Sequence, residues 1–269
     1  MSMKFLVSTS MALIALGANP ASADKLDDII SSGTLRCAVV LDFPPMGSRD
    51  ADNNPIGFDV DYCNDLAKSL GVTAEIVETP FPDRVPALMS DRADVIVGGT
   101  SDTLERAKTI GFSVPYFAFE MVLLTKKDSG IKTWEDMKGK NLGAISGTFQ
   151  AVQAEKDVNA WGSGAFRGYQ TQNDTIQAVD QGHIDGSIDT STVVAATLAS
   201  GNYPNLAMGP KVPYPIDYVA LGAAREEYGF LNYLNLFVNH QVRTGRYAEL
   251  YEKYFDGEPP QLTIDNVYR

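Results

Sequence analysis

The feature that most constrains the fold is a regular alternation between short apolar runs, typical of buried strands, and amphipathic segments, typical of helices. The alternation starts after Lys25 and gives expected strands at 35–41, 74–79 and 93–98 and expected helices at 58–70 and 84–89. Parallel strands joined by crossover helices produce this order of elements. The sequence therefore predicts an α/β fold.

A second unit of the same kind follows Tyr116. Its expected strands are 120–127, 141–146 and 183–188, and its expected helices are 150–158 and 173–180. One more strand, 217–224, and two helices end the chain. The last helix places aromatic residues at helical spacing, which indicates core packing: Tyr247, Tyr251 and Tyr254, with Leu250. With 44% hydrophobic residues, the chain is long enough for one large domain or two lobes.

The first 23 residues have the pattern of a secretory signal. Lys4 precedes an apolar run over 5–18, and Ala21-Ser22-Ala23 forms a small-x-small cleavage site before Asp24. The apolar run is too short for a permanent anchor, since a membrane-spanning helix needs about 20 apolar residues. We expect cleavage after Ala23 and a soluble, exported mature chain.

The charge balance excludes one broad class of partner. The chain has 34 acidic and 22 basic residues. Binding to nucleic acid or to an anionic membrane calls for a basic face. We therefore expect neither partner.

The two cysteines leave two interpretations open. Cys37 lies in an apolar run and Cys63 in an expected helix. An oxidising compartment permits a disulfide between them. Buried thiols in the core are at least as well supported, because both positions call for small apolar residues.

The stretch GGTSDTLER, residues 98–106, predicts a turn rich in backbone donors. We expect Asp102 or Thr103 to cap a short helix, with Glu105 as the partner in a capping box. The unpaired N–H groups of such a turn, together with the helix dipole, favour an anion.

Arg106 lies on the same face of that expected helix as Thr103, and a guanidinium can bind a carboxylate through two parallel hydrogen bonds. The alternative is a surface arginine paired with an acid such as Glu105. A similar turn at Gly147-Thr148, before the helix near Gln150, favours anion binding. Two such turns at strand ends would face each other across a cleft.

Catalytic and metal-binding motifs are missing from the sequence. Ser146 lies one place too late for a G-x-S-x-G nucleophile elbow, and His183 and His240, the two histidines, are expected at the surface. Asp59 and Asp61 fit a helix N-terminus better than a metal site. We predict neither catalytic residues, nor a metal, nor a cofactor.

Four stretches resemble one known family, the periplasmic solute-binding proteins of polar amino-acid ABC transporters (family 3). They are residues 26–40, 57–71, 83–117 and 136–149, and the most specific pattern is T-x-x-R followed by F-S-x-P-Y-F at 103–117. The resemblance implies a type II periplasmic-binding fold, in which each lobe has a mixed, mainly parallel sheet flanked by helices. Two hinge strands, near 116–121 and 213–218, would join the lobes.

The resemblance also implies a domain division and partners. After the signal peptide, 1–23, the first lobe would comprise 24–117 and 216–269, and the second lobe 118–215. Such a protein would act in the periplasm as a monomer, bind a small amino acid or related carboxylate, and present it to the membrane permease of an ABC importer.

The site residues come from the same resemblance. Arg106 would hold the ligand's α-carboxylate with help from Ser101, Gly99 would offer its carbonyl to the α-ammonium, and Phe43 would form one wall of the pocket. The second lobe would contribute Thr148 and Gln150. The full expected set is Phe43, Arg84, Gly99, Thr100, Ser101, Arg106, Thr148, Gln150, Asp189 and Thr190.

Two of these positions carry alternatives. Arg84 matches an arginine that meets the ligand side chain in acidic-amino-acid receptors, and its alternative role is structural, bonding loop carbonyls. The aspartate that usually holds the ammonium falls on Thr190, while Asp189 is one residue early. Either Asp189 serves, or neutral acceptors hold the ammonium.

We expect a receptor for a polar or acidic amino acid. If no carboxylate reaches the ammonium, an amino-acid derivative, an opine or another organic carboxylate fits better. A rival from the enzyme class is a secreted cyclohexadienyl dehydratase on the same fold, which needs a proton donor beside Arg106. A third function is that of a sensor input domain acting with a separate partner.

Overall fold

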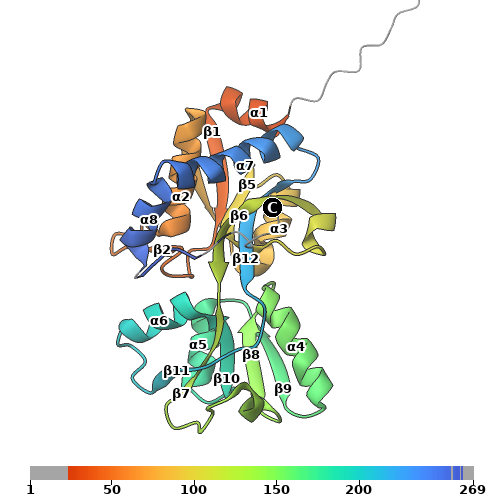
Figure 1. The fold of residues 1–269 in the computed structure, drawn as a ribbon, viewed down its shortest axis with the longest axis vertical. Coiled ribbons are helices and arrows are strands. Elements are labelled where there is room, and N and C mark those ends of the chain that lie inside the picture. Colours follow the sequence, from red (N-terminus) through yellow and green to blue (C-terminus); the bar gives the residue numbers. More distant parts are fainter. Residues whose placement is uncertain (1–23, 256, 261, 263–269) are drawn as a thin grey trace, which may run out of the picture.

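Two five-stranded sheets, one in each of two lobes, organise the molecule (Figure 1). The computed structural model describes residues 24–255, 257–260 and 262, so the expected signal segment 1–23 lies outside the described residues. Within the described part of the chain, every helix is too short or too polar to cross a membrane.

The sheet of the first lobe has the order β4-β1-β5-β12-β6. β1 pairs in parallel with β4 and β5, whereas β12 runs antiparallel to β5 and β6. The strands are β1 (Thr34–Val39), β4 (Thr73–Glu78), β5 (Val95–Ser101), β6 (Ile110–Phe119) and β12 (Asp217–Ala224). The same lobe contains α1 (Lys25–Ser32), α2 (Phe58–Leu70), α3 (Arg84–Met89), α7 (Tyr228–Arg243), α8 (Arg246–Tyr254), the hairpin β2 (Ser48–Arg49) and β3 (Pro55–Ile56), and the 3₁₀ turns η1 (Phe81–Asp83) and η2 (Arg106–Lys108).

The sheet of the second lobe has the order β11-β7-β10-β8-β9. Its strands are β7 (Met121–Lys126), β8 (Asn141–Ile145), β9 (Ala165–Tyr169), β10 (Gly186–Thr190) and β11 (Leu206–Lys211). Its helices are α4 (Phe149–Trp161), α5 (Gln172–Asp180) and α6 (Ser191–Ala199), with a 3₁₀ turn η3 (Trp134–Met137). The chain passes between the lobes twice, from β6 to β7 and from β11 to β12 (Figure 1).

A disulfide joins Cys37 of β1 to Cys63 of α2, with a Cα–Cα distance of 6.3 Å. Both residues are fully buried, as either interpretation of the sequence required, but the alternative of two free thiols is wrong. The bond ties the central part of the first-lobe sheet to the helix that covers it.

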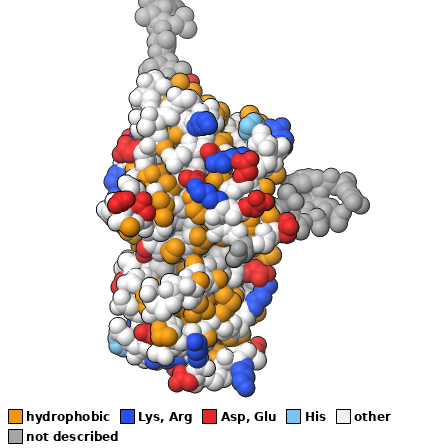
Figure 2. Space-filling view, turned by 90° about the vertical axis from the view of Figure 1, so that its left-hand side faces the viewer, with side chains coloured by type: hydrophobic (Ala, Val, Ile, Leu, Met, Phe, Trp, Pro, Cys, Tyr) orange, Lys and Arg blue, Asp and Glu red, His pale blue; other side chains and the backbone are white. Residues whose placement is uncertain are grey.

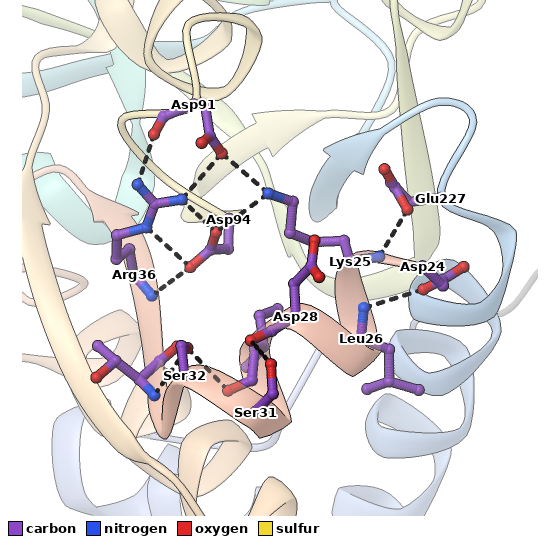
Figure 3. Close-up of polar contacts among 12 residues, drawn as sticks. Asp24, Lys25, Leu26, Asp28, Ser31, Ser32, Arg36, Asp91, Asp94 and Glu227 are labelled. Atoms are coloured by element: carbon purple, nitrogen blue, oxygen red, sulfur yellow. Dashed lines mark hydrogen bonds and ion pairs between the residues drawn. The ribbon is translucent and has the colours of Figure 1, made fainter. Parts of the chain in front are cut away.

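The first described residue, Asp24, connects the start of the chain to α7. Its carboxylate accepts hydrogen bonds from the backbone N–H of Leu26 in α1 (3.0 Å) and from those of Gly229 (2.8 Å) and Phe230 (2.9 Å) at the start of α7. One side chain therefore satisfies orphan donors at two helix N-termini. Figure 3 shows this carboxylate beside Leu26, close to the contact between the Lys25 backbone N–H and Glu227.

Replacement of Asp24 by alanine should lower the free energy of unfolding by about 1–2 kcal/mol, because the N-termini of two helices lose a negatively charged cap. Thermal melts of the protein without residues 1–23 measure the effect. Asp27→Ala is the matched control, since Asp27 lies exposed in the first turn of the same helix. Equal melting temperatures for the two variants would contradict the double cap.

Candidate functional site

Arg106 reaches from the first lobe to the second. Its Nη1 donates to the Ser101 carbonyl (3.1 Å) and its Nη2 to the carbonyl of Gly147 at the start of the second lobe's α4 (2.6 Å). The described residues thus accept from two of the five guanidinium N–H groups. The remaining donors of this half-buried side chain fit a carboxylate.

The capping box expected at this turn is wrong, and the expected helix is reduced to one short turn. β5 continues to Ser101, and the backbone N–H of Asp102 donates to the Tyr218 carbonyl, because β12 pairs with β5 up to this point. The chain then makes the single 3₁₀ turn η2, which is too short to carry an appreciable helix dipole. Thr103 Oγ1 does accept from the N–H of Arg106 (3.3 Å), whereas Glu105 pairs with Lys108 instead of forming a capping box.

Arg84 is buried and bonds mainly to backbone carbonyls. Its Nη1 donates to Gly98 and Gly99 (2.7 Å to the latter), its Nε to Phe81 (3.0 Å) and its Nη2 to Gly147 (3.2 Å). Burial and the nearby charge of Arg106 lower the pKa of this guanidinium to about 9. These contacts are those of the structural alternative, and they leave one N–H for a ligand.

Gly99 occupies the centre of the turn that was expected to contact the ligand. Its φ of +55° is left-handed, and a Cβ there would lie 3.3 Å from the ring of Phe43. Its carbonyl accepts from Arg84, and its N–H donates to Tyr116 Oη (3.2 Å). Phe43 itself packs edge-on against Phe81 (ring centroids 4.9 Å apart), so it is a buried wall of this region.

Asp217 is a site residue that the sequence did not reveal. It is the first residue of β12, and its carboxylate accepts from Ser101 Oγ (3.0 Å). Burial raises its pKa to about 6, although the hydrogen bond from Ser101 and the charges of Arg106 and Arg84 act in the opposite direction. An acidic residue at the first position of an otherwise apolar strand was the signal that could have identified it. Thr100, buried beside Ser101, contacts Arg84 through its hydroxyl (3.2 Å).

The turn expected in the second lobe is a true helix N-terminus. Thr148 caps α4: its Oγ1 accepts from the N–H of Ala151 (3.3 Å) and donates to the Ile145 carbonyl (2.6 Å). Gln150 follows in the first turn and is buried. Gly147 has φ +78°, and a Cβ there would lie 2.8 Å from the Cα of Pro82 in the first lobe, so the lobes meet closely at this glycine.

Asp189 and Thr190, the last residues of β10, differ in what they bind. Asp189 is fully buried, and its carboxylate accepts from the side-chain amide of Gln172 and from the backbone N–H of Thr190 (2.7 Å). Burial raises the pKa of Asp189 to about 7. The hydroxyl of Thr190 caps α6 by accepting from the N–H of Val193 (3.3 Å).

Asp42 and Gln172 form a further contact between the lobes, which the sequence did not predict. Asp42, in the loop after β1, accepts a hydrogen bond from the backbone N–H of Gln172 at the start of α5 (2.9 Å). Burial raises the pKa of Asp42 above its ordinary value. Nothing in the local sequence marks this pair, because 130 residues separate its members.

Asp59 is linked to Gly99 of β5 through the hydroxyl of Tyr116. It is completely buried in the first turn of α2 and accepts from Tyr116 Oη (2.8 Å), which in turn accepts from the N–H of Gly99. Burial raises the pKa of Asp59 to about 7, and the Tyr116 hydrogen bond and the charge of Arg84 offset part of that effect.

This pKa predicts a pH-dependent stability. Between about pH 4 and pH 7 the folded protein keeps a proton on Asp59 that the unfolded chain releases, so this contribution to the free energy of unfolding declines as pH rises through that window. Urea denaturation of Asp59→Asn at several pH values should show a smaller decline than the unsubstituted protein. Parallel curves for the two proteins would contradict the assignment.

A groove of about 540 Å³ also spans both lobes, but none of the expected ligand residues lines it. Its walls come from α6, α8, Pro45 and Met208. Figure 2, seen from the side on which α6 and α8 lie in Figure 1, shows hydrophobic side chains gathered on both lobes. The groove is therefore separate from the group of residues around Arg106.

Two lobes, two segments of chain that connect them and an arginine that bridges the lobes define a solute-binding architecture. Residues 35–257 match the model of the bacterial extracellular solute-binding proteins, family 3, and the chain belongs to that family.

Relatives of known function resemble the chain over most of its length. The arginine-binding extracellular protein ArtP of Bacillus subtilis is 25% identical, covering 93% of this chain and 94% of its own. The cyclohexadienyl dehydratase of Pseudomonas aeruginosa is 29% identical, covering 91% of each. The structure of an ancestral arginine-binding protein bound to arginine has a TM-score of 0.77 and 29% identity, covering 83% of this chain and 99% of that one. The relatives thus include binding proteins and an enzyme.

Proposed function

We propose that this protein is the periplasmic receptor of an ABC importer and binds a small, polar amino acid between its lobes. The observation that carries the proposal is Arg106, whose guanidinium bridges Ser101 and Gly147 and keeps unused donors at the junction of the lobes. A carboxylate bound there would contact both lobes at once. Closure would then present both lobes to a membrane permease.

Electrostatics around the junction support a zwitterionic ligand. Arg106 and Arg84 supply positive charge next to Gly147. Asp42 and Asp189 supply carboxylates near Gln172. The amino-acid ligands in the names of the relatives, among them arginine, fit this distribution of charge.

A thermal-shift screen tests the proposal. The mature protein is melted with each proteinogenic amino acid, with cystine, and with opines and organic acids, because a ligand that binds the folded state alone raises the melting temperature. We expect polar amino acids to give the largest shifts. If no carboxylate-bearing compound raises the melting temperature, the proposal fails.

One observation favours a second function, that of a cyclohexadienyl dehydratase. The relative from Pseudomonas aeruginosa is such an enzyme. Asp217 offers a carboxyl group that can carry a proton, because burial raises its pKa to about 6, and the charge of the nearby Arg106 acts on that pKa. Incubation of the purified protein with prephenate and with arogenate decides between the two functions. Turnover that Asp217→Asn abolishes would replace the receptor by the enzyme.

A further inference from the structure

Gln172, the first residue of α5 in the second lobe, contacts both the first lobe and the end of β10. Its backbone N–H donates to Asp42 of the first lobe (2.9 Å), and its side-chain Nε2 donates to the carboxylate of Asp189. Since the amide nitrogen faces Asp189, the amide oxygen points elsewhere. Gln172 is 3% exposed, and its Oε1 has no hydrogen-bond partner among the described residues.

A buried amide oxygen without a donor destabilises the folded state, because it has lost its hydrogen bond to water, so such an atom calls for a partner. The surroundings determine which kind of partner fits. The charges that shift the pKa of Asp42 come from Glu78 and Asp174, and the charge that shifts the pKa of Asp189 comes from Asp42. All of these are carboxylates. Glu78 is paired with Arg49 (2.6 Å), whereas Asp42, Asp174 and Asp189 form no ion pair with the residues that the structure describes, so this region keeps acceptors and uncompensated negative charge.

We propose that Gln172 is a ligand-binding residue whose Oε1 accepts a hydrogen bond from a charged nitrogen of the ligand, an ammonium or a guanidinium. Asp42 and Asp189 supply the opposing charge. The inference rests on the proposed function and narrows it: the ligand carries a cationic nitrogen as well as a carboxylate, which favours free amino acids over organic acids.

The same residue couples recognition to closure. Asp42 belongs to the first lobe and meets the N–H of Gln172 at the N-terminus of α5, where a negative charge is favoured. A ligand nitrogen held by Gln172 would therefore lie beside a contact that joins the two lobes. Gln172 would bind the positively charged nitrogen of the ligand, as Arg106 would bind its carboxylate.

The test compares ligands that differ by one charged nitrogen. The probes are the amino acid that raises the melting temperature most, its 2-hydroxy acid and, for a cationic side chain, the neutral analogue, such as citrulline for arginine. Calorimetric titration of Gln172→Met should show affinity lost roughly tenfold to hundredfold for the probe that carries the recognised nitrogen, and unchanged affinity for the analogue without it. The 2-hydroxy acid tests whether Gln172 binds the α-ammonium, and the analogue with a neutral side chain tests whether it binds a side-chain nitrogen.

Gln170→Met is the matched control, because Gln170 is exposed two residues earlier in the same loop and should leave all affinities unchanged. If Gln172→Met binds every probe as tightly as the unsubstituted protein does, or loses the same factor for all of them, the inference is overturned while the receptor function stands. The unsubstituted protein provides a check that needs no variant: equal affinity for the amino acid and for both analogues also overturns the inference. If no amino acid binds at all, the receptor function itself fails.

Discussion

Arg106→Ala is expected to abolish the thermal shift produced by any amino acid and to weaken binding at least roughly hundredfold. In the closed cleft a ligand carboxylate would lose its charged partner and would be left desolvated, which costs several kcal/mol. Arg106→Lys should recover part of the affinity, because an ammonium keeps the charge but lacks the planar pair of donors. Calorimetric titration of the ligand found in the screen measures both variants.

Lys108→Ala is the control for Arg106→Ala. Lys108 lies two residues further in the same 3₁₀ turn, and its ammonium forms an exposed ion pair with Glu105. Its loss should leave ligand affinity unchanged and cost little stability. An Arg106→Ala protein that folds and binds its amino acid with unchanged affinity would show that Arg106 does not hold the carboxylate.

Removal of the disulfide should give the largest loss of stability. Cys37 and Cys63 are 26 residues apart, and the loop-closure entropy of a cross-link over that distance is worth about 3.5 kcal/mol. For the Cys37→Ala/Cys63→Ala double variant we expect the melting temperature to fall by roughly 10 °C. Differential scanning calorimetry of the mature protein measures the change.

Reduction supplies the control for the double variant. Dithiothreitol should lower the melting temperature of the unsubstituted protein toward that of the variant, and it should leave the variant unaffected. Two titratable thiols in the unfolded, unreduced protein, with no effect of dithiothreitol on melting, would show that the cysteines are not joined.

The periodic parts of the chain were predictable. The expected helices at 58–70 and 84–89 and the expected strand at 217–224 have the bounds of α2, α3 and β12. Two of the elements that were missed, β9 and α6, lack a clear period. β9 is a largely exposed edge strand without an apolar run, and α6 is rich in β-branched residues that do not favour a helix locally.

The site was less predictable than the fold, because its contacts join distant segments. The extension of β5 to Ser101 depends on β12, whose residues come more than 100 positions later, and local capping signals could not reveal it. The same holds for Asp217 opposite Ser101 and for Asp42 opposite Gln172. A resemblance to a family supplies Arg106, but residues that a family pattern does not contain require the structure.

The order of strands in the first-lobe sheet has a consequence for the route by which the protein is made. β12 lies between β5 and β6, so these two strands, adjacent in sequence, cannot be joined until residue 224 is available. The second-lobe sheet needs nothing beyond the continuous segment from Met121 to Lys211. In a chain that emerges with its N-terminus first, the second lobe can be complete while the first lobe still lacks its last strand. The lobe that carries Arg106 and the disulfide should therefore be the last to assemble.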